Sequence, residues 1–187
     1  QGTLPSSLTE LSLGRDFDHP LLPGVLPASL RKLTLGPAFN QPLQPHAVPE
    51  GVVQLMLGAK FNQPLPLGAL PSSLRSLDLG AFDHPLEPGI LPAHLANLTM
   101  GTEFNQPLPP GALPESLRFL TFSNAFNHPL PPGVLPGSVV LLSMGPRFNQ
   151  PLQPGAIPST VTHLWLGLDF NQPLLPGVLP RGLLELA

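Results

Sequence analysis

The chain has no cysteine among its 187 residues. This absence excludes disulfide bridges, zinc sites built on thiolates and catalysis by a cysteine nucleophile. Charged residues are also scarce: they make up 10% of the chain, with eight Lys and Arg against eleven Asp and Glu. Because nucleic-acid binding depends on Lys and Arg contacts to phosphates, we expect no nucleic-acid partner. No apolar run approaches the length of a membrane span, so we expect no membrane insertion.

Proline and glycine are abundant, and together they account for 47 of the 187 residues. Without periodicity, such a content is typical of disordered chains. Here, however, 24 of the 29 prolines fall into three columns that recur every 21 or 22 residues. Proline lacks a backbone N–H and breaks helices, and it recurs too often for a helix to form between its occurrences. The sequence therefore predicts a regular structure with prolines at its corners and little or no α-helix.

The most regular feature is a five-residue block, Phe-(Asn/Asp)-(Gln/His)-Pro-Leu, that occurs eight times. The blocks begin at Phe17, Phe39, Phe61, Phe82, Phe104, Phe126, Phe148 and Phe170. Every interval is 22 residues except the one between Phe61 and Phe82, which is 21. A fixed period of this size predicts a stack of like units in which each unit contacts only its neighbours.

Each unit also contains the pattern Leu-x-x-Leu-x-Leu-Gly, as at Leu8, Leu11, Leu13 and Gly14. Its last two leucines alternate with a variable residue, which indicates a short, half-buried strand. At this period the pattern is that of a leucine-rich repeat. We therefore predict a β-solenoid with one parallel sheet of about nine short strands and a Pro-rich, extended outer face. Because that outer face should be nearly as thin as the sheet, we expect a rod or a weakly curved arc.

The conserved spacing of the Phe residues and of the strand leucines predicts that they form the core. Burial of each such side chain contributes about 1.5–3 kcal/mol. The residue after each Phe is Asn or Asp, at a turn where stacked loops need hydrogen-bond partners. We predict a structural ladder along this column, formed by Asp18, Asn40, Asn62, Asp83, Asn105, Asn127, Asn149 and Asn171.

Five repeats carry the full block Phe-Asn-Gln-Pro-Leu, and several strands are preceded by a segment of the form Leu-Pro-x-Ser-Leu. In these motifs the chain, from Leu4 to Leu186, resembles the FNIP repeat family, a 22-residue variant of the leucine-rich repeat. The resemblance implies a solenoid that binds protein partners and has no catalytic residues. The departures from the family pattern include His46 in a glycine column and Ser123 at the glycine that follows the strand.

No residue set suggests chemistry. His19, His84 and His128 share a column but lie two or three repeats apart, roughly 10–14 Å at the spacing of stacked strands. One metal ion cannot bridge that distance, so we expect no metal site. The glycines recur as turn residues and do not form a phosphate-binding loop. We expect no cofactor and no enzymatic activity.

Binding in a solenoid is carried by the variable positions of the sheet surface. Towards the C-terminus these include Phe119, Leu141, His163 and Trp165, and Met56 lies in an earlier strand. Exposed aromatic and apolar residues are typical of interfaces, so we predict that these five side chains bind a partner. Alternatively, Trp165 only covers the sheet or packs on a further repeat. Regular hydroxyl columns also raise ice or carbohydrate binding, but Met56, Asp78 and Trp165 interrupt the column and make this less favoured.

For the whole chain we predict a single solenoid domain, residues 1–187, of eight repeats without recognisable terminal caps. The favoured function is a non-enzymatic scaffold that binds protein partners through the sheet face. Uncapped coils of a solenoid expose core residues and strand edges. The alternative is therefore a structural, self-assembling element in which copies join end to end as a homo-oligomer.

Overall fold

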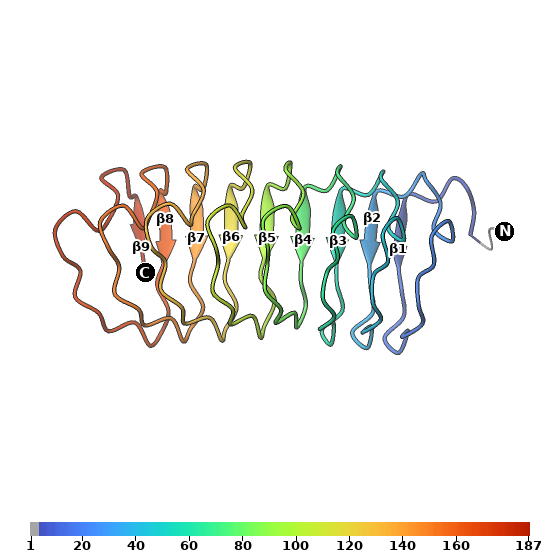
Figure 1. The fold of residues 1–187 in the computed structure, drawn as a ribbon, viewed down its shortest axis with the longest axis horizontal. Coiled ribbons are helices and arrows are strands. Elements are labelled where there is room, and N and C mark those ends of the chain that lie inside the picture. The colour runs from blue at the N-terminus through green and yellow to red at the C-terminus, as the bar shows by residue number, and fades with distance from the viewer. Residues whose placement is uncertain (1–3) are drawn as a thin grey trace.

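The computed structural model describes residues 4–187; residues 1–3, which the predicted single domain includes, lie outside the described part. Nine strands form one parallel sheet in chain order (Figure 1). Their bounds are β1 (Glu10–Ser12), β2 (Lys32–Thr34), β3 (Gln54–Met56), β4 (Ser76–Asp78), β5 (Asn97–Thr99), β6 (Phe119–Thr121), β7 (Leu141–Ser143), β8 (His163–Trp165) and β9 (Glu185–Leu186). The described residues include no helix, and hence none that could cross a membrane. The predicted β-solenoid is confirmed.

The strands pair in equivalent register, so that repeated residues stack in columns. Leu33 of β2, for example, lies between Leu11 of β1 and Leu55 of β3. The middle residue of each strand from β2 to β8 is buried, and the two flanking residues face outward. This alternation follows from the two-residue period of a strand. It places the variable residues of the sequence on one open sheet face.

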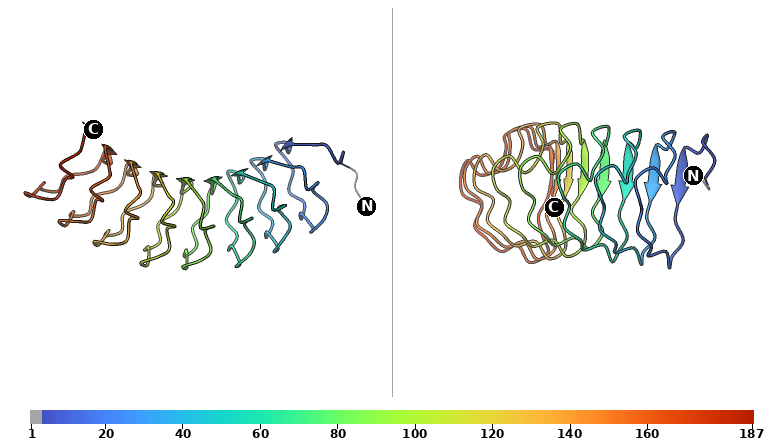
Figure 2. Two further views of the ribbon diagram at one scale, coloured as in Figure 1. Left: turned by 90° about the horizontal axis from the view of Figure 1, so that it is seen from above. Right: turned by 45° about the vertical axis from the view of Figure 1, so that its right-hand side comes forward.

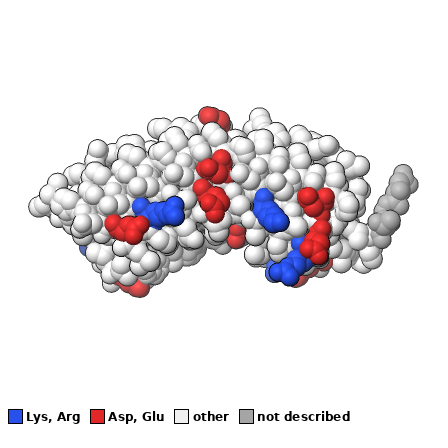
Figure 3. All heavy atoms as spheres, turned by 90° about the horizontal axis from the view of Figure 1, so that it is seen from below, with Lys and Arg blue, Asp and Glu red and all other residues white. Residues whose placement is uncertain are grey.

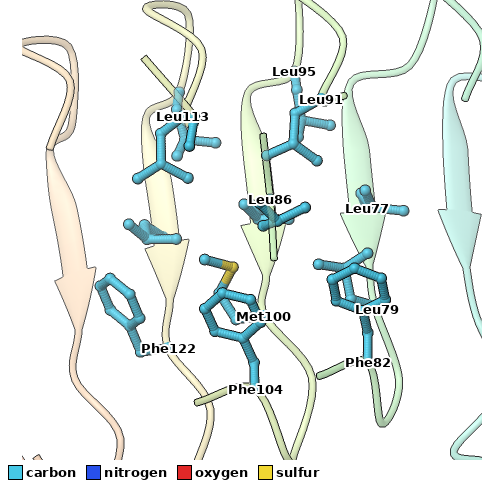
Figure 4. Close-up of a cluster of buried hydrophobic side chains, with 14 of the residues drawn as sticks. Leu77, Leu79, Phe82, Leu86, Leu91, Leu95, Met100, Phe104, Leu113 and Phe122 are labelled. Atoms are coloured by element: carbon cyan, nitrogen blue, oxygen red, sulfur yellow. The ribbon is translucent and has the colours of Figure 1, made fainter. Parts of the chain in front are cut away.

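The core is a stack of like side chains that runs along the solenoid (Figure 4). The phenylalanine rings of successive repeats lie nearly parallel, as in Phe39 and Phe61, whose centroids are 6.1 Å apart at an interplanar angle of 7°. Phe61 and Phe82 are the exception: within residues 4–187 each ring stacks on its other neighbour, Phe39 or Phe104, but the two do not stack on each other. This gap coincides with the single 21-residue interval. One missing residue therefore interrupts the ring stack.

The solenoid bends into an arc with the strands on its concave side, and the coils fan out on the convex side (Figure 2). Hydrogen bonds between coils hold the strand side together, as between Leu13 N and Thr34 O at 2.9 Å. On the convex side the backbone bonds close turns within one coil, such as Val25 N to Leu22 O at 3.3 Å. The solenoid is therefore more strongly curved than the weak curvature predicted from the sequence. Prolines on that side have no N–H with which to tie one coil to the next.

A ladder of side-chain oxygens joins the loops that follow the strands. The Oδ1 atom of each Asn or Asp accepts a hydrogen bond of 2.8–3.0 Å from the backbone N–H of the equivalent residue in the next coil. The ladder runs without a break from Asp18 to Asn171. Only the acceptor is used, which explains why Asp18 and Asp83 can replace Asn. The Gln of the motif adds a second donor to the same oxygen, as Gln41 does to Asp18 at 3.0 Å.

A second ladder, which was not predicted from the sequence, lies where each coil enters its strand. The hydroxyl of Ser29 donates to the carbonyl oxygen of Leu8 in the preceding coil at 2.6 Å. Equivalent bonds are made by Ser73, Ser116, Ser138 and Thr160. Gly51, His94 and Gly182 occupy this column without a hydroxyl. At the first two, Arg31 and Arg75 of the preceding coils donate to the carbonyl oxygens of Gly51 and His94, both at 3.1 Å.

The shortened repeat changes the loops around it. Gly80 has a φ of 66° and Gly101 a φ of 79°, in the left-handed region that glycine tolerates. Two coils later, Ser123 replaces the glycine of this column and is buried. Its hydroxyl donates a hydrogen bond to the carbonyl oxygen of Phe104 in the preceding coil. Ser123 thus gives a buried acceptor its partner beside the irregular loops.

Candidate interaction face

The candidate site lies on the concave sheet face, where four of the six outward residues of β6, β7 and β8 are apolar or aromatic and the other two are Thr121 and Ser143. Phe119, Leu141 and His163 are register partners on these three adjacent strands. Phe119 is exposed, with 44% of its surface accessible, while Leu141 and His163 are half-buried. The structure therefore brings three of the predicted residues into one continuous row. We call this row, together with Trp165, the apolar patch.

Trp165 completes the apolar patch from the second outward position of β8. Its indole lies against the His163 imidazole, with ring centroids 6.1 Å apart and an interplanar angle of 26°. Along its own column its neighbours are Ser143 on β7 and, beyond the other edge of β8, Ala187, whose backbone oxygen accepts a bond from Leu166 N. Both neighbours are small and do not cover the indole completely, so Trp165 is only half-buried at the sheet surface.

The imidazole of His163 is held from two sides. Its Nδ1 atom lies 2.9 Å from the hydroxyl of Thr162, and its Nε2 atom lies 3.9 Å from the Oε2 atom of Glu185 on β9. Neither Thr162 nor Glu185 was among the predicted site residues. Glu185 could have been found, because it is the next member of the column that contains His163.

Met56 does not belong to the apolar patch. It lies on β3, two strands before β5 and three before β6, and its column neighbours are Thr34 and Asp78. Its side chain is 45% exposed and stands alone among polar residues. Single exposed apolar side chains are common on protein surfaces and carry little meaning. The structure thus separates Met56 from the other four predicted residues.

The face has few charges, and most of them lie away from the apolar patch. The charged outward residues of the strands are Glu10, Lys32, Asp78 and Glu185. Between β6 and β9 the only carboxylate or ammonium among them is that of Glu185. At the carboxyl ends of the strands, charged side chains of both signs are scattered over an otherwise uncharged surface (Figure 3). No basic patch is visible on that face.

The described residues offer no assembled set of catalytic or metal-binding groups. Within residues 4–187 no three His, Asp or Glu side chains gather as metal ligands would. His84 and His128 instead contact the backbone oxygens of Asn62 and Asn105, at 3.2 and 2.9 Å. A hollow of about 330 Å³ lies at the carboxyl ends of β3–β6. It is lined by Asp78, Thr99 and Thr121, the last residues of β4, β5 and β6, and by residues of the loops that follow. It contains no nucleophile paired with a base.

The model of the FNIP repeat matches almost the whole chain in overlapping segments: residues 1–37, 39–82, 61–103, 82–125, 104–147, 126–169 and 148–187. The chain belongs to the FNIP repeat family. The overlapping matches agree with the coils described above, since most of them span two successive repeats. This FNIP repeat protein is therefore a leucine-rich-repeat-like solenoid in sequence as well as in backbone.

Among solved structures, this FNIP repeat protein is similar to CroV588, a novel circular LRR protein, with 33% identity and a TM-score of 0.85. The match covers 98% of this chain but only 30% of CroV588, so the chain spans under a third of that protein. YopM from Yersinia enterocolitica WA-314 matches at 22% identity over 98% of this chain and 51% of its own, with a TM-score of 0.39. No curated protein matches the chain.

Proposed function

We propose that this FNIP repeat protein is a non-enzymatic scaffold that binds a protein partner through its concave sheet face. The observation that supports this is the apolar patch of Phe119, Leu141, His163 and Trp165, which forms a continuous row across β6, β7 and β8. Interfaces are enriched in Trp, Phe and other aromatic residues at their centres. Leucine-rich-repeat-like folds commonly serve as interaction scaffolds, which agrees with this assignment.

The test is a binding measurement with a partner that has first been isolated on the immobilised chain and then purified. Phe119→Ser and Trp165→Ser should each weaken binding at least about tenfold, because exposed aromatic residues at an interface centre are hot spots. Met56→Ser is the matched control, since it removes an equally exposed apolar side chain elsewhere on the same face. Unchanged affinity of the Phe119 and Trp165 variants would remove the apolar patch as the binding site.

A second candidate function, assembly of copies end to end, is favoured by the terminal coils. In the last coil Leu174 is 44% exposed and Leu186 is 43% exposed, whereas their counterparts in the preceding coil, Leu152 and Leu164, are 5% and 0% exposed. Such a coil end is covered either by a further repeat of a longer chain or by another copy. Light scattering over a range of concentrations tests the second case. A mass that stays at one chain at high concentration contradicts it.

A further inference from the structure

The far end of the apolar patch combines an aromatic surface with an exposed carboxylate. Trp165 and His163 lie ring against ring, and Glu185 on β9 is the register partner of His163, with Trp165 one outward position further along β8. The Glu185 side chain is 51% exposed, and within the described part of the chain its ion-pair contact is with His163 alone, at 3.9 Å. That distance is too long for a hydrogen bond, so the carboxylate keeps its acceptor capacity.

An aromatic ring together with a carboxylate is a combination that binds a cationic side chain. A guanidinium or ammonium group is attracted to the face of an aromatic ring within about 6 Å, and Trp is the strongest such partner. A carboxylate beside the ring adds a charge-assisted hydrogen bond, which Arg can form with two N–H groups. Arg is also less strongly hydrated than Lys and stacks on aromatic planes, which favours it here.

The charge distribution of the face agrees with a cationic partner group. The outward residues of β6–β9 include no Lys or Arg, and their one carboxylate is Glu185. Lys32, the basic residue of the face, lies on β2, six strands before β8. Arg118 and Arg181 are exposed in this part of the chain but lie outside the strands, so an incoming cation meets Glu185 on the sheet itself without a Lys or Arg among the outward strand residues.

We propose that the corner formed by Trp165 and Glu185 binds an arginine side chain of the protein partner. This inference rests on the proposed function, of which it names the partner chemistry. Leu141 on β7 lies two strand spacings from Glu185, roughly 10 Å. An extended chain covers this distance in about three residues. The partner segment thus carries an aliphatic side chain about three residues from its arginine, positioned to contact Leu141.

Trp165 is the single tryptophan of the chain, so its fluorescence reports on this corner directly. The probe is the acetylated peptide amide Leu-Ala-Gly-Arg, and its control is the same peptide with citrulline, which has the shape of arginine without its charge. In titrations up to about 5 mM, which covers millimolar affinities, the arginine peptide should bind at least about fivefold more tightly than the citrulline peptide. The difference should shrink as salt is added.

The decisive variant is Glu185→Gln, which should abolish the preference for arginine while leaving the weak binding of the citrulline peptide unchanged. Glu10→Gln is the matched control, because Glu10 occupies the same column on β1 with Ser12 in place of a tryptophan. Glu10→Gln should keep the full preference. Equal binding of both peptides to the original chain, or a preference that survives Glu185→Gln, overturns the inference.

The outcomes also separate this inference from the proposed function. If both peptides bind equally and Phe119→Ser weakens them, the sheet face binds apolar partners without an arginine, and only the inference fails. If neither peptide changes the fluorescence of Trp165, the arginine corner is overturned. The scaffold function is then judged by the purified partner and the Phe119→Ser and Trp165→Ser variants alone.

Discussion

The Oδ1 atom of Asp18 accepts a 2.9 Å hydrogen bond from the backbone N–H of Asn40 in the next coil. This bond, and a second from the Gln41 side chain, lower the pKa of Asp18 below its ordinary value of 3.8. A carboxylate with a lowered pKa in the folded state stabilises the fold in full above its unfolded pKa. That stabilisation is lost as the pH falls from about 3.8 through the lowered value.

We predict that Asp18→Asn makes the chain less sensitive to acid. An amide keeps the acceptor oxygen but does not titrate in this range, so the bond to Asn40 survives at low pH. The melting temperature of the original chain should fall more steeply than that of the variant as the pH drops below about 4. Thermal unfolding followed by circular dichroism between pH 7 and pH 3 measures this. Parallel curves for the two chains would contradict the role of Asp18.

In the middle of the ladder, Asn105→Ala removes the acceptor that binds the Asn127 N–H at 3.0 Å. The expected loss is about 0.5–1.5 kcal/mol of unfolding free energy, the net contribution of one hydrogen bond. Asn105→Asp keeps the acceptor, as Asp18 and Asp83 do, and should cost much less. Urea unfolding of the three chains gives the comparison. An aspartate variant as unstable as the alanine variant would show that the amide N–H₂ group matters after all.

His46 is the one non-glycine residue of the described chain with a positive φ, 63°. It follows Pro45 in a turn closed by Ala47 N and Gln44 O at 3.1 Å, where other repeats have glycine. His46→Gly should therefore stabilise the chain by about 1 kcal/mol, because glycine adopts this conformation without strain. His46→Ala keeps the strain and serves as the control, with no gain expected. Urea midpoints measure both, and an equal gain in the alanine variant would assign the effect to the imidazole instead.

Ser123→Gly restores the residue that most other repeats carry at this position, yet it should destabilise the chain. The hydroxyl of Ser123 is buried and donates to the Phe104 carbonyl oxygen, which would lose its partner. An unsatisfied buried acceptor costs about 1–3 kcal/mol. Ser123→Ala should lose a similar amount, which separates the hydrogen bond from backbone effects. A neutral or stabilising glycine variant, measured by urea unfolding, would show that water or a shifted loop satisfies Phe104.

The sequence was sufficient to predict the solenoid, its sheet and the outward columns, because periodicity decides all three. The 22-residue interval fixes which residues stack, and the alternation around Leu11, Leu33 and Leu55 fixes which side is buried. Contacts between residues of different columns could not be predicted in this way. The Arg31 and Arg75 bonds to Gly51 and His94, and the contact of the His163 ring with the Trp165 ring, depend on side-chain reach and not on spacing.

The candidate site was predicted in part for the same reason. Phe119, Leu141 and His163 share one column, so their adjacency follows from register alone. Met56 was grouped with them for its apolar character, and only the order of the strands shows how far it lies from β6. Thr162 orients His163 from outside the strand columns, where periodicity gives no guidance.

The interrupted ring stack between Phe61 and Phe82 affects where the array of repeats separates when it unfolds. In a repeat protein, stability is approximately the sum of the intrinsic stabilities of the repeats and of the interactions between neighbouring coils. This boundary keeps its strand pairing, the Asp83 N–H bond to Asn62 at 2.9 Å and the Ser73 hydroxyl bond to Val52, but it lacks stacked rings. Under load or partial denaturation the chain should therefore separate there into two blocks. Each block would keep its own stack of rings, Phe17 to Phe61 in the first and Phe82 to Phe170 in the second.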